Sequence, residues 1–239
     1  MPAILEKWKV LPHGALSAID RDLLTVTGEI HMPLGKFTRR MTVARLAGGG
    51  SVIFSAIALD EPEMARIEAL GPPAWLVVPS AMHRMDAVIW KARYPSIRVV
   101  TPEGAREKVA AVVPVDATTD ILGDPEVRFV TLPGTEAQES ALEVRRPAGM
   151  TLVLNDIVGN IHDAHGVSGF LLKLAGFAGD EPQLPRMLKR GLVADEEALA
   201  DQLRAWADNP ALKRILVSHG DPIEEDPAGK LRAVAASLD

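Results

Sequence analysis

The sequence predicts an α/β protein in which two mixed β-sheets pack face to face and carry helices on their outer sides, a four-layer αβ/βα sandwich. Each half of the chain begins with segments typical of antiparallel strands. Each half then alternates helices with short apolar strands, which is typical of parallel pairing. The pattern restarts after a break near residues 116–124. We therefore expect one domain over residues 1–239, built from two structural halves at residues 1–120 and 121–239.

The first half opens with segments rich in β-forming residues. The expected strands cover residues 23–30, 38–46 and 51–57, with a glycine-rich turn at 47–50 before the last. A helix over residues 60–70 follows, because an acidic start, Pro62 and Gly71 are boundary signals. The next expected elements alternate between strand and helix, at residues 75–78, 86–94, 97–100 and 102–109.

The second half repeats this order without repeating the residues. Its expected strands are 127–132, 141–146, 150–154 and 214–217. A helix over residues 194–207 places Leu199, Leu203 and Trp206 on one face, and a last helix presents Leu231 and Leu238 to the core. The two halves are therefore related only in topology.

Composition excludes several classes of function. The formal net charge of −6 and the pI of about 5.6 argue against a nucleic-acid binder, whose affinity comes mainly from Lys and Arg on phosphates. Arg39 and Arg40 form a local basic pair, which we interpret as a solvated strand edge. The chain has no cysteine, which excludes disulfides and thiolate metal sites. Any metal must therefore be held by His, Asp or Glu.

Nothing in the sequence predicts a membrane or export segment. Residues 1–10 carry three charged side chains and lack the apolar centre of a signal peptide. The apolar stretch at residues 167–178 is interrupted by Lys173 and is too short to span a bilayer of about 30 Å. We expect a soluble, cytoplasmic protein without a membrane partner. Its small-molecule ligand or substrate is unknown, and a homo-oligomer is compatible with the sequence.

Three residues capable of binding a metal follow short apolar strands. His83, Asp156 and His219 lie just beyond the expected strands at 75–78, 150–154 and 214–217. Functional groups of α/β sheets gather beyond the carboxyl ends of strands. Imidazole and carboxylate are the ligands that Zn²⁺ or Fe²⁺ takes where thiolates are absent. The three residues are therefore candidate ligands of one metal ion.

The order of these junctions resembles the metallo-β-lactamase superfamily over nearly the whole chain. Members carry a His-x-His-x-Asp-His loop after an apolar strand, then a Pro-Gly-His turn, a strand ending in Asp and a late strand ending in His. The corresponding segments here are LVVPSAMHRM, LPGT, LVLND and LVSHG, at residues 76–85, 132–135, 152–156 and 216–220. The hairpin expected at residues 41–57 also fits the opening strands of that fold.

The departures from the family pattern concern the metal ligands. The loop positions are occupied by Ser80, Met82, Arg84 and Met85, and Thr135 stands at the third histidine position. Only Asp156 and His219 stand at positions where the family has a metal ligand. His83 lies in the first loop but not at one of its ligand positions. A dinuclear site needs about six to eight protein ligands, so the usual zinc pair is largely lost.

Two hypotheses follow from the resemblance. In the first, the fold serves a non-catalytic or ligand-binding role without metal, Asp156 and His219 are joined by a hydrogen bond, and Arg84 replaces the charge of the metal. In the second, one zinc or iron ion is held by His83, Asp156 and His219 and activates water against an ester, amide or related bond, with Asp156 in a catalytic role.

Other polar residues give weaker signals. His162 and His165 follow Asp156 closely, and their roles stay open between solvated loop residues and a metal or substrate function. Ser80 and Ser218 lie near histidines but lack the G-x-S-x-G turn of serine hydrolases. The apolar section at residues 170–192 could line a pocket or form a dimer contact, and packing against its own core is the main expectation.

Overall fold

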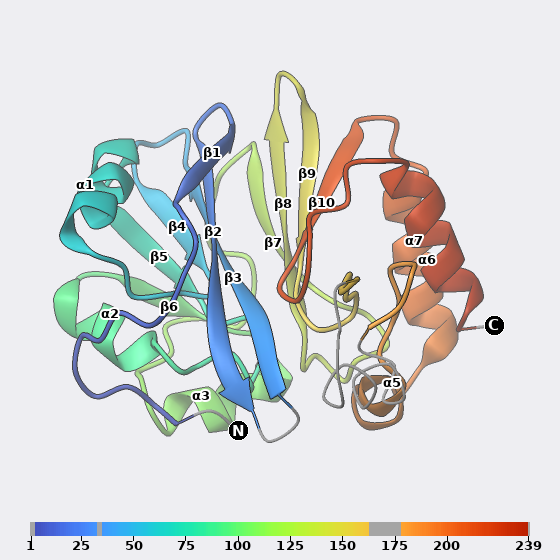
Figure 1. Cartoon of the computed structure of the whole chain (residues 1–239), viewed down its shortest axis with the longest axis horizontal. Helices are drawn as coiled ribbons and strands as arrows, with labels where there is room; N and C mark the ends of the chain where they lie inside the picture. The colour runs from blue at the N-terminus through green and yellow to red at the C-terminus, as the bar shows by residue number, and fades with distance from the viewer. Residues whose placement is uncertain (1–2, 33–34, 163–177, 239) are drawn as a thin grey trace.

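Two β-sheets face each other in the computed structural model, with helices on both outer sides (Figure 1). The structure describes residues 3–32, 35–162 and 178–238. This arrangement confirms the predicted αβ/βα sandwich with two mixed sheets. No helix among the described residues is long and apolar enough to cross a membrane.

The first sheet contains six strands in sequence order. They are β1 (Ser17–Asp20), β2 (Leu23–Met32), β3 (Gly35–Arg45), β4 (Ser51–Phe54), β5 (Pro73–Val77) and β6 (Arg98–Val100). The first four pair antiparallel, whereas β4, β5 and β6 pair parallel. The predicted strand over residues 51–57 ends at Phe54 because Ser55 has a positive φ of 55°, which breaks the extended conformation.

The second sheet has four strands in the order β10-β9-β8-β7. They are β7 (Val127–Thr131), β8 (Ser140–Arg146), β9 (Gly149–Leu154) and β10 (Leu212–Val217). The β8–β9 pair is the predicted hairpin, and β10 adds parallel to β9. Because β9 and β10 run in the same direction, the residues that follow them meet at one edge of the sheet.

Helices cover the outer face of each sheet (Figure 1). On the first sheet these are α1 (Glu61–Leu70), α2 (Ala87–Arg93) and α3 (Arg106–Ala110), the last preceded by the 3₁₀ turn η1 (Glu103–Ala105). On the second they are α6 (Glu196–Ala207) and α7 (Pro227–Ala236), with α5 (Arg186–Leu192) nearby. Helix α6 begins two residues later than predicted because the Asp195 side chain accepts a hydrogen bond from the Ala198 amide as an N-cap.

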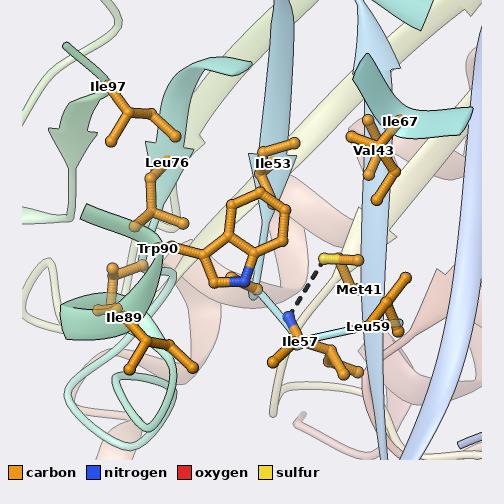
Figure 2. Packing of buried hydrophobic residues seen from close by; sticks show 14 of the residues in the cluster. Met41, Val43, Ile53, Ile57, Leu59, Ile67, Leu76, Ile89, Trp90 and Ile97 are labelled. Atoms are coloured by element: carbon orange, nitrogen blue, oxygen red, sulfur yellow. Dashed lines mark hydrogen bonds between the residues drawn. The ribbon is translucent and has the colours of Figure 1, made fainter. Parts of the chain in front are cut away.

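Alternating side chains divide the core into layers. On β4, Ile53 faces the outer helices, whereas Val52 and Phe54 face the second sheet. Trp90 of α2 lies fully buried at the centre of the outer layer, as Figure 2 shows. This two-residue alternation is the period of a strand buried on both faces, and it fixes which polar residues can reach the space between the sheets.

The adjacent arginines of β3 are buried, so the expectation of a solvated strand edge is wrong. Strand β3 lies between β2 and β4 and points successive side chains to opposite faces. Arg39 forms an ion pair with Asp86 beside α2. Arg40 points to the second sheet and donates to the carbonyls of Val217 and Gly220, at 2.9 and 2.8 Å. The pair therefore connects layers of the sandwich.

A candidate metal centre at the sheet edge

His83, Asp156 and His219 come together at one edge of the sandwich. His83 follows β5 of the first sheet, while Asp156 and His219 follow the parallel strands β9 and β10 of the second. The Asp156 Oδ1 atom lies 3.1 Å from His83 Nε2 and 3.0 Å from His219 Nε2. The three side chains are only 8–14% exposed. Residues 73 and 136 positions apart in the sequence therefore form one compact cluster.

The far side of each imidazole ring is held by a polar neighbour. His83 Nδ1 lies 3.0 Å from Ser55 Oγ, directly after β4. His219 Nδ1 donates to the carbonyl oxygen of Thr38 on β3, and the Thr38 hydroxyl accepts from the Gly220 amide at 2.8 Å. Such contacts fix the orientation of a metal-binding histidine and leave Nε2 as the atom that faces the site.

The contact between His219 and Asp156 requires a cation. A neutral ring that donates from Nδ1 has a lone pair on Nε2, which would face the carboxylate oxygen of Asp156. Either a proton or a metal ion must separate the two acceptors. In the metal-free cluster, burial lowers the pKa of His219, but the hydrogen bond to Asp156 and its charge outweigh burial and raise that pKa above its usual value.

Asp156 is a carboxylate in this cluster. Burial acts to raise its pKa, but the charge and hydrogen bonds of the two imidazoles outweigh burial and hold the pKa well below its usual range. The site therefore combines one anion with two aromatic nitrogen donors. This is a donor set that divalent zinc and iron accept.

A second, fully buried carboxyl group, which is absent from the predicted site, lies behind Asp156. Glu139 is 1% exposed and accepts from Asn155 Nδ2 at 3.0 Å. Asn155 in turn accepts from the Ser218 hydroxyl at 2.9 Å. Burial, followed by the charge of Asp156, raises the pKa of Glu139 well above its usual value. Asn155 and Ser218 directly precede Asp156 and His219, which is the one sequence signal that could have indicated this network.

The remaining predicted residues lie elsewhere. The Arg84 guanidinium donates to the main-chain carbonyl of Lys108, whereas the ion pairs of Asp156 within the described chain are with the two histidines. This differs from the expectation that Arg84 replaces a metal charge, which would place the guanidinium within salt-bridge reach of Asp156. His162 is exposed, and His165 lies outside the described residues.

The donor atoms fit one ion and not two. One nitrogen or oxygen atom from each of His83, Asp156 and His219 lies within 4.8 Å of the others, and the described residues contain no other group of three or more such side chains. Three protein ligands with a free fourth position are the number typical of a catalytic zinc site. A second ion would need three or more further ligands.

Gly220 should be essential for the placement of His219. It has a φ of +102°, and a Cβ atom there would lie 1.9 Å from the Asn160 carbonyl oxygen. We expect Gly220→Ala to lower the free energy of unfolding by about 2–5 kcal/mol, from backbone strain and overpacking together. Gly49→Ala is the matched control, since its φ is +98° and its Cβ would meet nothing within 4 Å. Strain alone predicts about 1–2 kcal/mol there. If urea unfolding shows the same loss of unfolding free energy in both variants, the close contact between the new Cβ atom and the Asn160 carbonyl oxygen would be contradicted.

Comparisons with known proteins agree with this architecture. The chain is similar to the metallo-β-lactamase FIM-1 from Pseudomonas aeruginosa in its mono-zinc form, with a TM-score of 0.61 and 14% identity over 96% of this chain and 97% of that one. It is also similar to metallo-β-lactamases from Erythrobacter litoralis (TM-score 0.65, 13% identity, 93% and 96% covered) and Hirschia baltica (0.62, 10%, 94% and 98%). No protein-family model and no curated protein matches the sequence. At these identities the likeness is one of fold, and the chain has the metallo-β-lactamase fold.

Proposed function

We propose that this protein binds one divalent metal ion through His83, Asp156 and His219 and hydrolyses an ester, amide or related bond. The convergence of these three donors, drawn from both sheets within 4.8 Å, carries the proposal. The usual dinuclear zinc site of the fold would be reduced to a single ion. The mono-zinc form of FIM-1 shows that a protein of this fold accepts one zinc.

The surrounding residues prepare the three donors for this role. Thr38 accepts from His219 Nδ1, which leaves Nε2 of the neutral ring as a ligand atom. Asp156 supplies a negative charge, since the pKa of its carboxyl lies well below the usual range. Burial and the charge of Asp156 raise the pKa of Glu139 well above its usual value, which disfavours a second negative charge beside the site. When bound, a divalent ion supplies a Lewis acid that lowers the pKa of a water molecule in the open position to about 7.

Metal content and hydrolysis test the proposal separately. Protein prepared without a histidine tag or chelator should hold about one zinc or iron ion per chain, or take up one when Zn²⁺ or Fe²⁺ is titrated into it. The loaded protein should then hydrolyse chromogenic esters or amides faster than the chelated protein does. A chain that neither retains nor binds metal would overturn the proposal. Bound metal without hydrolysis across both substrate classes would overturn only the enzymatic part.

A metal-free, ligand-binding role is the second candidate. The hydrogen-bonding distances of 3.0 and 3.1 Å between Asp156 and the two imidazoles favour it, because a proton on His219 Nε2 satisfies the same contact. In that case His219 and Asp156 would form a buried imidazolium–carboxylate pair, and the contact of Asp156 with His83 would join the second sheet to the first. Absence of metal binding in the titration would leave this role as the better account.

A further inference from the structure

Ser55 has a backbone conformation that serine rarely adopts. Its φ is 55°, in the left-handed region, and its side chain is buried with 5% exposure. Glycine adopts this region freely, and asparagine and aspartate tolerate it better than other residues do. For serine the left-handed conformation costs conformational energy. Strained residues persist where the surrounding structure fixes them, and they cluster at functional sites.

The neighbours of Ser55 hold it in this conformation. Its amide donates to the Val77 carbonyl at 3.0 Å, which continues the β4–β5 pairing one residue past the end of β4. Beyond it, the Ile57 amide donates to Met41 Sδ and the Ala58 amide to Asp86 Oδ1 (Figure 2 shows the first of these bonds). Residues on both sides are therefore tied to β5, β3 and the start of α2.

The side chain of Ser55 is directed at the candidate metal centre. Its Oγ atom lies 3.0 Å from His83 Nδ1, on the opposite side of the ring from Nε2 and Asp156. His83 lies in the loop after β5 and depends on contacts from other elements for its orientation. A glycine at position 55 would avoid the strain, but it would give His83 no hydrogen-bonding partner.

We propose that Ser55 is a positioning residue that fixes the ring of His83, so that Nε2 faces the metal. The hydroxyl accepts from Nδ1–H, which leaves the Nε2 lone pair free for an ion. The inference rests on the proposed function, since it assigns to Ser55 a role in the same centre. Loss of an outer partner of a metal-binding histidine typically weakens metal affinity by about 10–100-fold.

Two substitutions separate positioning from a purely structural role. Ser55→Ala removes the hydroxyl and keeps the strain, whereas Ser55→Gly removes both. We expect both variants to bind Zn²⁺ about 10–100-fold more weakly in calorimetric titration. Thermal unfolding of the metal-free proteins should show a higher Tm for Ser55→Gly than for Ser55→Ala. Ser51→Ala is the matched control, because Ser51 is a buried serine of β4, the strand directly before Ser55, and its hydroxyl donates to the Gly71 carbonyl away from the site.

The outcomes are distinct. Unchanged zinc affinity in Ser55→Gly would overturn the proposal. A zinc affinity that falls in proportion to Tm across Ser55→Ala, Ser55→Gly and Ser51→Ala would overturn it as well, because affinity would then report only stability. If the unsubstituted protein binds no metal, the proposed function fails, and nitrogen NMR of metal-free protein tests Ser55 by itself. The ring signals of His83 should then shift in both Ser55 variants and stay in place in Ser51→Ala. Unchanged His83 signals in the Ser55 variants would overturn the positioning role as well.

Discussion

Asp156→Asn should reduce bound metal from about one ion per chain to nearly none. The asparagine side chain has nearly the shape of aspartate, so it removes the negative charge while leaving the packing around the site in place. Two neutral imidazoles would remain, and two ligands without a charge are too few for a stable zinc or iron site. Metal analysis after dialysis, together with calorimetric titration of Zn²⁺, measures the loss.

Asp221→Asn is the matched control for this substitution. Asp221 is an exposed carboxylate two residues after His219, so it changes the net charge equally without touching the three donors. It should retain about one ion per chain. Equal metal binding by Asp156→Asn, Asp221→Asn and the unsubstituted protein would show that the ion binds elsewhere. Loss of metal in both variants would point to a general effect of charge.

Part of the candidate metal centre can be predicted from where residues lie relative to strands. His83, Asp156 and His219 are predictable as candidates because each follows a short apolar strand. The parallel pairing of β9 and β10 brings Asp156 and His219 to one edge, whereas His83 follows β5 of the facing sheet. The convergence of Asp156 and His219 follows from that pairing alone, whereas the approach of His83 depends on how the two sheets face each other. Whether they hold a metal stays a prediction, as does the division of the chain at residue 120.

The supporting residues could not be predicted in this way. Ser55 shows no residue-type signal, because serine is not favoured at positive φ and its role arises from three separate backbone anchors. Glu139 precedes a strand like many surface glutamates, and only the packing of Asn155 against it reveals the network. Arg39 and Arg40 look like a solvated pair until β3 is placed between two neighbours. Each of these contacts joins residues far apart in the sequence, which local patterns do not encode.

Breaking the buried ion pair of Arg39 and Asp86 should cause the largest loss of unfolding free energy. The Asp86 side chain is fully buried and the Arg39 side chain 8% exposed. Arg39→Met would leave the carboxylate without its cation, which typically costs about 3–5 kcal/mol of unfolding free energy. Arg45→Met is the matched control, since Arg45 is exposed on the same strand and should change stability by less than about 0.5 kcal/mol. Urea unfolding followed by circular dichroism compares the two.

A double substitution shows that the loss comes from an unpaired charge. In Arg39→Met/Asp86→Asn the buried group is neutral, and the asparagine oxygen still accepts from the Ala58 amide as Asp86 Oδ1 does. Most of the stability lost in Arg39→Met should therefore return. A double variant no more stable than Arg39→Met would assign the loss to the packing of the arginine stem instead. Because Asp86 lies three residues after His83 and anchors the segment that holds Ser55, Arg39→Met should also weaken metal binding, and the double variant should restore it.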